Sequence, residues 1–339
     1  MSVSNRIQRY LNSATITLAP LWCAVSLLGQ QGPDGASYIT FSGLPVGINN
    51  SNTVAGRFSS LGGAGFLRFE SGEIVSFNVG TGGDTRPVAI NAADTVTGFF
   101  FQNSAYYGFI RARQGGIVTF AVRDGTTFPA AINVEGTVTG SFCPCLFPGP
   151  ISGFVRYPGG QIVSFDPPGS IYTSPTGINA SNTITGTFED ADGHFHGFVR
   201  DPFGNITSFD PPGGGQTSPV SINDAGEIAG PYVADGSFHG FIRSASGTFI
   251  TIDGPGSIGT SIASINARGT ITGTYQLSTV LTRSFVRTPN GEIETFSVPN
   301  CDSNPSAPAE INDLGVVLGT CSMGISGRLG YLRIPPPSH

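Results

Sequence analysis

Histidine is scarce in this chain, and two of its 4 histidines stand in the same local context. His196 and His239 each come directly before Gly-Phe, and His194 lies two residues before the first of them. An imidazole can serve as a metal ligand or as an acid–base group near neutral pH. If the two Gly-Phe segments are equivalent parts of neighbouring structural units, both imidazoles come within reach of one ligand. The alternative is a tolerant surface position, because the other copies carry Ala64, Tyr107, Ser152, Arg283 and Leu329.

Three aspartates occupy a second recurrent position, at the start of a loop rich in Pro and Gly. Asp166 and Asp210 open the sequence D-P-P-G, and Asp253 opens D-G-P-G. Grouped carboxylates could bind a cation or supply the acid and base of a hydrolase. Such an aspartate is also ordinary turn chemistry, and other copies have Ser42, Asn78, Ala121 and Ser297 there. The candidate ligand-binding residues are therefore Asp166, Asp210, Asp253, His194, His196 and His239.

The segment EDADG (189–193) is the one stretch that suggests a metal ion. It contains D-x-D-G, yet it lacks the Glu and the spacing of a calcium-binding loop. We therefore expect no cofactor and assign no metal ligand, with a bound calcium ion as the alternative.

An internal repeat must position these side chains. The dipeptide Ile-Asn occurs seven times, at spacings of 42, 42, 46, 44, 43 and 46 residues. Gly, Asn or Asp stands three residues after each Asn, and these are the residue types that tolerate positive φ. The repeat predicts an Asx-type turn in which the Asn side chain accepts backbone N–H bonds. The asparagines are Asn49, Asn91, Asn133, Asn179, Asn223, Asn266 and Asn312.

An aromatic-x-Arg triplet follows in every copy, and most copies continue with a motif such as GEIVSF (72–77). Each copy thus holds four short apolar runs separated by turn residues, which predicts four strands. A ring of guanidinium groups could bind a carboxylate or phosphate. The interpretation we favour places each one at a strand end, bonded to loop carbonyls or to an Asp. The arginines are Arg68, Arg111, Arg156, Arg200, Arg243, Arg287 and Arg333.

A four-stranded unit of this length, repeated seven times, predicts an all-β fold, a seven-bladed β-propeller with four antiparallel strands per blade. The last copy ends at Arg333 without its fourth strand, whereas an extra strand at 37–42 precedes the first copy. Joining the two completes the last blade and closes the ring, which removes exposed sheet edges. We predict one domain over 37–334 and a tail over 335–339. The DPPG loops then lie on one face and the N-x-x-G turns on the other.

Composition supports short strands and an exported protein. Charged residues make up 11% of the chain, and its net charge of −6 argues against nucleic-acid binding. Residues 1–29 are predicted to be a signal peptide or an N-terminal apolar segment, because two arginines precede an apolar stretch that is short for a membrane span. We expect a secreted, periplasmic or cell-surface protein with no membrane span in the mature chain. Four cysteines then remain, which favours a disulfide between Cys301 and Cys321, with Cys143 and Cys145 bridged locally or free.

The repeats resemble the HAF family of extracellular repeats found in secreted bacterial proteins. The closest copy is HGFVRDPFGNITSFDPPGGGQTSPVSINDAGEIAG (196–230), and the resemblance covers nearly all of 37–334. It departs from the family in having Gly before the aromatic residue and Arg after it, where the family often has His-Ala-Phe-Leu-Trp. The resemblance implies an exported propeller-like domain and carries no activity onto particular residues.

The first functional hypothesis is a secreted binding scaffold whose ligand, a small molecule, glycan or protein, sits on the face with the DPPG loops. One alternative is a propeller enzyme, a hydrolase or lyase on a glycan or lactone, with Asp and His at the channel mouth. No nucleophile elbow, phosphate-binding loop or dinucleotide fingerprint supports it. Another alternative is a structural or adhesive surface protein. Aromatic residues that could stack on a sugar are Tyr106, Tyr107, Tyr232 and Tyr275.

Overall fold

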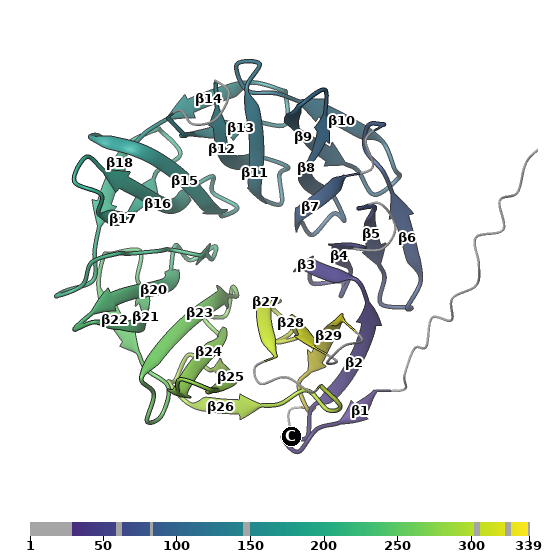
Figure 1. Cartoon of the computed structure of the whole chain (residues 1–339), viewed down its shortest axis with the longest axis vertical. Helices are drawn as coiled ribbons and strands as arrows, with labels where there is room; N and C mark the ends of the chain where they lie inside the picture. The colour runs from purple at the N-terminus through teal and green to yellow at the C-terminus, as the bar shows by residue number, and fades with distance from the viewer. Residues whose placement is uncertain are drawn as a thin grey trace, which may run out of the picture.

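The computed structural model describes residues 29–58, 63–81, 84–144, 150–301, 306–322 and 327–337. This part of the chain contains strands and no helix. The strands form seven antiparallel sheets, arranged as blades around a central axis (Figure 1). The protein is therefore an all-β, seven-bladed propeller, as the repeat predicts.

Six blades are each built from four strands that follow one another in the chain. Blades 1 and 2 contain β3 (Leu44–Ile48), β4 (Val54–Arg57), β5 (Gly65–Arg68), β6 (Ile74–Phe77), β7 (Thr85–Ile90), β8 (Val96–Gln102), β9 (Ala105–Arg111) and β10 (Ile117–Phe120). Blades 3 and 4 contain β11 (Thr126–Ile132), β12 (Val138–Cys143), β13 (Ser152–Arg156), β14 (Ile162–Phe165), β15 (Ser170–Ile178), β16 (Ile184–Asp190), β17 (Phe195–Arg200) and β18 (Ile206–Phe209). Blades 5 and 6 contain β19 (Ser221–Ile222), β20 (Ile228–Ala234), β21 (Ser237–Arg243), β22 (Phe249–Ile252), β23 (Gly259–Ile265), β24 (Ile271–Ser278), β25 (Leu281–Arg287) and β26 (Ile293–Phe296).

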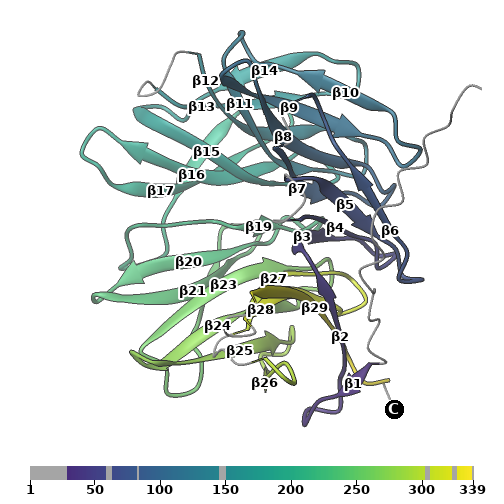
Figure 2. The same cartoon turned by 45° about the vertical axis from the view of Figure 1, so that its right-hand side comes forward.

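The seventh blade combines both ends of the chain. It contains β27 (Ala307–Ile311), β28 (Val317–Ser322) and β29 (Arg328–Ile334), and β2 (Ser37–Ser42) lies antiparallel beside β29. The predicted closure by the N-terminal strand is confirmed. A further strand, β1 (Gln30–Gln31), pairs with β2 and makes this blade five-stranded. The repeat does not predict β1, because no copy contains its equivalent. Figure 2 shows β1 and β2 running beside β29 near the C-terminus.

A buried ion pair fastens this closure. The Arg333 Nε lies 2.8 Å from an Asp34 carboxylate oxygen, and the Tyr38 hydroxyl donates to the same carboxylate at 2.7 Å. Burial alone would raise the pKa of Asp34, but the hydrogen bonds from Tyr38 and Arg333 outweigh it and lower the pKa. The side chain of Arg333 is only 2% exposed. Asp34, which precedes β2, is therefore part of the folded ring.

The blades pack through the aromatic residue of each third strand. These side chains are fully buried: Phe66, Phe109, Phe154, Phe198, Phe241, Phe285 and Tyr331. The repeated glycine of the second strand makes room for them. A β-carbon on Gly186 would stand 2.3 Å from the Ser174 carbonyl oxygen and 2.9 Å from the ring of Phe198. A larger residue at this glycine position would separate the strands.

The first strand of each blade is its innermost strand and lies nearest the central axis (Figure 1). The residue before the Ile of each Ile-Asn dipeptide is Gly, Ala or Ser in six blades, and it is Glu310 in the seventh. The Glu310 carboxylate accepts a hydrogen bond from the Ile48 backbone N–H of blade 1 at 2.7 Å. Burial raises the pKa of Glu310 to about 7. One carboxyl group thus interrupts a wall of small side chains.

The predicted disulfide between Cys301 and Cys321 is present, with the two α-carbons 5.8 Å apart. Cys321 takes the place of the aromatic residue that the second strand carries in the other copies, and it is buried. Cys143 is also buried, and Cys145 lies outside the described residues. The predicted signal segment lies outside them as well, apart from Gly29. Within the described ranges, no helix is long and apolar enough to cross a membrane.

Candidate functional site

The asparagines of the repeat form a closed ring of hydrogen bonds on one face of the propeller. Each Asn side-chain oxygen accepts the backbone N–H of the residue four positions on, which closes its own turn. Each side-chain N–H also donates to the backbone carbonyl of the Asn in the next blade, at 2.9–3.2 Å. The last of these bonds joins Asn312 to Asn49 and closes the circle. Repeat geometry therefore occupies both ends of the amide, and little hydrogen-bonding capacity remains for a ligand.

The repeat arginines are held between blades in a similar way. In six of them a guanidinium N–H donates to the carbonyl of the following residue at 3.2–3.3 Å. In six the guanidinium also lies over the aromatic ring that ends the preceding blade, for example Arg111 over Phe77 at 4.8 Å. Arg287 lacks this ring, because residue 252 is Ile. A cation over a ring face is attracted by the ring quadrupole, so these six arginines each link two blades.

The opposite face carries the predicted aspartates and histidines, and the structure joins four of them into two pairs. In blade 4, His196 Nδ1 lies 2.6 Å from an Asp210 carboxylate oxygen. In blade 5, His239 Nδ1 lies 2.8 Å from an Asp253 oxygen. Each histidine lies on a third strand, and each aspartate follows the fourth strand of the same blade. The pairs therefore occupy equivalent positions in neighbouring blades. They lie on the outer strands and not on the innermost first strands.

The two remaining candidates have other partners. Asp166 in blade 3 accepts a hydrogen bond from the Thr173 hydroxyl at 2.7 Å. Its blade has Ser152 where blades 4 and 5 have histidine, so no imidazole faces it. Asp210 makes the same kind of bond with Thr217. Each threonine contact joins the loop after a fourth strand to the start of the next blade. The aspartate therefore also has a structural role. The side chain of His194 is 64% exposed and lies 3.7 Å from an Asp190 oxygen.

His196 is enclosed by carboxylates. Its Nε2 lies 3.2 Å from Asp190, and its ring packs on Phe188 with centroids 5.2 Å apart. Burial would lower the pKa of His196, but the hydrogen bonds to Asp210 and Asp190 outweigh it and raise the pKa. The pKa of Asp190 is lowered to about 2, mainly by the hydrogen bond that it accepts from the His194 backbone N–H. Both ring nitrogens of His196 are engaged, so this pair has little capacity left for a ligand.

His239 differs in having only one engaged nitrogen. Its ring packs on Tyr232 at 5.5 Å, and within the described part of the chain its Nε2 has no hydrogen-bond partner. When Nδ1 donates to Asp253, a neutral ring carries its lone pair on Nε2. Asp253 thus orients His239 as a hydrogen-bond acceptor or general base.

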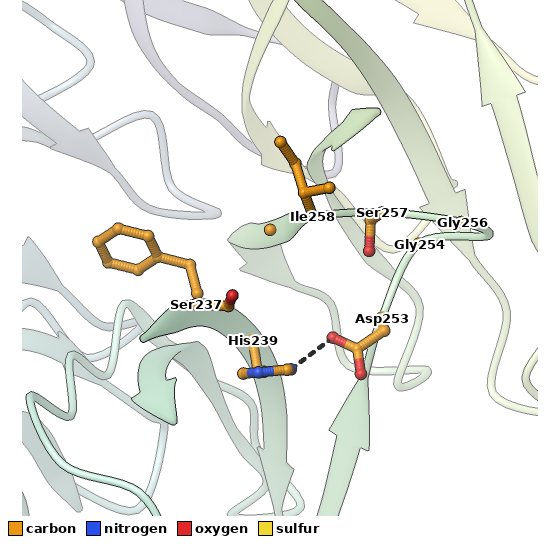
Figure 3. Close-up of a pocket in the computed structure, with 9 residues that line it drawn as sticks. Ser237, His239, Asp253, Gly254, Gly256, Ser257 and Ile258 are labelled. Atoms are coloured by element: carbon orange, nitrogen blue, oxygen red, sulfur yellow. Dashed lines mark hydrogen bonds and ion pairs between the residues drawn. The ribbon is translucent and has the colours of Figure 1, made fainter. Parts of the chain in front are cut away.

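A pocket of about 290 Å³ adjoins this second pair (Figure 3). It lies at the junction of blades 5 and 6, between the start of β21 and the loop that leads to β23. His239 and Asp253 line it together with two apolar side chains, Phe238 and Ile258, which are 59% and 51% exposed. Neither apolar residue was singled out from the sequence. A pocket with apolar walls and a few convergent polar groups is the usual form of a ligand site.

The EDADG segment brings Asp190, Asp192 and His194 together, with one ligand atom of each within 4.8 Å of the others. One oxygen of Asp190 already accepts the backbone N–H groups of the other two residues, which is an Asx-type turn. Its other oxygen faces His196. These contacts account for the cluster without a cation, and calcium stays an alternative prediction.

Comparison with known proteins identifies the fold class only. No family model matches the chain, and no curated protein matches its sequence. A virginiamycin B lyase from Staphylococcus aureus superposes with a TM-score of 0.60 at 15% identity, over 88% of this chain and 99% of that one. A streptogramin B lyase gives 0.58 at 17% identity, over 86% and 93%. A puromycin hydrolase gives 0.57 at 13% identity, over 85% of this chain and 53% of that one. At such identities the likeness shows the propeller fold alone.

Proposed function

We propose that this protein is an exported ligand-binding propeller whose site is the pocket beside His239 and Asp253. The observation that carries the proposal is an imidazole that a carboxylate holds in place in a pocket with exposed apolar residues, and whose Nε2 has no hydrogen-bond partner among the described residues. The same His–Asp arrangement in blade 4 lacks this open nitrogen. Export is supported by the disulfide, because such bonds persist in oxidising compartments.

The pocket chemistry favours a small organic ligand, or the side chain of a larger one, with an apolar part and a hydrogen-bond donor. The apolar part would lie against Phe238 and Ile258, and the donor would bond to His239 Nε2 or to the free oxygen of Asp253. A ligand ammonium group would suit this carboxylate as well. The volume of about 290 Å³ matches the lower end of small-molecule pockets.

A second candidate function is catalysis by the same pair, as a lyase or hydrolase on a glycan or lactone. The observation that favours it is the orientation of His239 by Asp253, which is the arrangement a general base needs. Among the proteins of similar fold, one virginiamycin B lyase is described as catalytically inactive when a histidine is replaced by alanine. This parallel is an analogy of fold and transfers no residue role to this chain.

The test is a binding screen of metabolites on the purified full chain, followed by titration of any hit against three variants. We expect His239→Gln and Asp253→Asn to weaken binding about tenfold or more, because each removes one of the two polar anchors. His194→Gln is the matched control, since this exposed histidine of the same face does not line the pocket. Equal affinity of His239→Gln and the wild type would refute the site. Turnover of the hit by the wild type, lost in His239→Gln, would favour the enzyme.

A further inference from the structure

Blades 2 and 3 carry an aromatic cluster that the repeat does not require. The ring of Tyr106 packs against Phe99, Phe101 and Phe128, and Phe99 also packs against Phe128, with centroid separations of 5.1–5.5 Å. The guanidinium carbon of Arg86 lies 5.7 Å from two of them, Phe99 and Tyr106. We call these five residues the aromatic platform. None of them is fully buried, and Phe101 is 41% exposed.

The platform lies near the central axis, on the face with the DPPG loops. Arg86 and Phe128 each precede the proline of a first strand, near the start of that strand, and the first strands are the innermost strands of the blades (Figure 1). The equivalent residues in the other blades are Leu44, Ser174, Ser218, Ser261 and Ala307. Five blades thus place small or aliphatic residues at this level, and blades 2 and 3 place an arginine and an aromatic ring.

Packing of the blades does not explain Phe99 and Phe101. Side chains alternate across a strand, and Phe100 between them points into the core and is 4% exposed. Its neighbours therefore point to the opposite side of the sheet, toward Phe128 of the next blade. At the position of Phe99 the other blades carry Arg57, Ser141, Thr187, Pro231, Thr274 and Thr320. The fold accepts polar or small residues there.

Polar groups that can still form hydrogen bonds lie at the edge of the platform. The Arg86 Nε lies 2.9 Å from one carboxylate oxygen of Asp84, and the two side chains are 38% and 31% exposed. Among the residues that the structure describes, the terminal guanidinium nitrogens, the second Asp84 oxygen and the Tyr106 hydroxyl have no hydrogen-bond partner. The ion pair is neutral overall and offers both donors and acceptors.

We propose that the aromatic platform is a binding site for a neutral saccharide. The apolar C–H face of a pyranose ring would lie on Tyr106 and Phe101, and adjacent hydroxyls would bond to the guanidinium and carboxylate of Arg86 and Asp84. Aromatic rings supply contact area with little loss of conformational entropy, and paired planar groups match vicinal hydroxyls. Because the ion pair cancels its own charge, a neutral ligand suits it better than an anion. This site is separate from the pocket beside His239 and does not depend on its function.

The experiment is a titration of the full chain with neutral gluco-, manno-, galacto- and xylo-oligosaccharides, followed by calorimetry and ligand-observed NMR. We expect binding of at least one series, and a loss of about tenfold or more in Tyr106→Ala and in Arg86→Ala. Tyr106→Phe keeps the stacking face and removes the hydroxyl, so we expect a smaller loss, about threefold to tenfold. Melting temperatures show whether each variant is folded.

The matched control is Phe203→Ala. Phe203 is 92% exposed and lies in a hairpin on the face with the asparagine turns, so its removal deletes an exposed ring elsewhere on the same propeller. Saccharide binding should be unchanged in Phe203→Ala. The proposal is overturned if the wild type binds none of the series at about 10 mM. It is also overturned if Tyr106→Ala and Arg86→Ala bind as the wild type does, or if Phe203→Ala weakens binding equally.

Discussion

The two faces of the propeller use the same strands for different purposes. On the face with the asparagine turns, one hydrogen bond between blades is repeated all the way around the ring. On the face with the DPPG loops, the side chains differ from blade to blade. His–Asp pairs occur in blades 4 and 5, and an aromatic cluster spans blades 2 and 3. We call the face with the asparagine turns the uniform face, and the face with the DPPG loops, whose side chains differ between blades, the individual face.

The difference teaches where function can reside in a symmetric fold. Each repeat asparagine has a neighbour at a fixed distance in the next blade, so its side-chain hydrogen bonds are satisfied inside the ring, as those of Asn223 are. Residues that vary have no such partner, and some keep open polar groups, such as His239 Nε2. We therefore expect variants of the uniform face to lower stability and variants of the individual face to lower binding.

The largest effect should come from the closure of the ring. Asp34→Ala removes one of the two carboxylates that pair with Arg333, whose side chain is 2% exposed, and leaves only the half-exposed Glu294 beside this buried charge. It also leaves the buried Tyr38 hydroxyl without its acceptor. We expect a loss of about 3 kcal/mol or more in the free energy of unfolding, measured by urea denaturation. Arg113→Ala is the control, since this 65% exposed arginine lies 3.4 Å from Asp94, whose carboxylate keeps its bond from the Asn49 amide, and the change should alter stability by less than about 1 kcal/mol. Similar losses in both variants would contradict the role of Asp34.

The next largest effect should come from the asparagine ring. Asn223→Ala removes the bond to the Asn266 carbonyl, which then keeps only its bond from the Gly269 N–H, and it leaves the Glu227 backbone N–H of its own turn without an acceptor. We expect a loss of about 2–3 kcal/mol, again by urea denaturation. The matched control is Asn205→Ala, because Asn205 is an exposed turn residue that bonds only to Asp201. If Asn223→Ala were as mild as this control, the ring of bonds would be incidental.

Much of this fold could be predicted from the sequence, because the repeat carries it. Seven copies of a four-strand pattern indicate the blades, and the unmatched strand at 37–42 indicates the closure. Contacts between blades could not be read in this way. The bond from Asn223 to the next blade, and the position of Arg111 over Phe77, depend on the rotation from one blade to the next. Spacing along the chain does not contain that rotation.

The candidate site was predicted as a set of residues and not as an arrangement. His239 and Asp253 were selected because they vary between blades, yet their pairing depends on the register of β21 against the loop after β22. The aromatic platform gave a weaker signal, the run of three phenylalanines at 99–101. Alternation along a strand separates these into core and exposed rings only once the strand is placed. The resemblance to HAF repeats stays a prediction.

The pH dependence of stability should distinguish Glu310, on an innermost strand, from the residues of both faces. The pKa of Glu310 is raised from 4.5 to about 7 in the folded protein. The folded state thus holds the proton more tightly, and this stabilisation is present below the unfolded pKa and is lost as the pH rises through about 7. Between about pH 5 and 8 the wild type should lose on the order of 2 kcal/mol relative to Glu310→Gln. Parallel stability–pH curves for the two proteins would contradict this expectation.

The smallest stability effect should come from the pocket, and it sharpens the comparison most. His239 lies at the surface beside an open pocket, and its bond to Asp253 is accessible to water. Such pairs contribute little to folding, so His239→Gln should change the free energy of unfolding by less than about 0.5 kcal/mol. His196→Gln, in the enclosed blade-4 pair, should cost more, because two carboxylates then lose the imidazole that lies between them. If the two histidine variants were equally destabilising, His239 would be a structural residue and the individual face would lose its clearest candidate for binding.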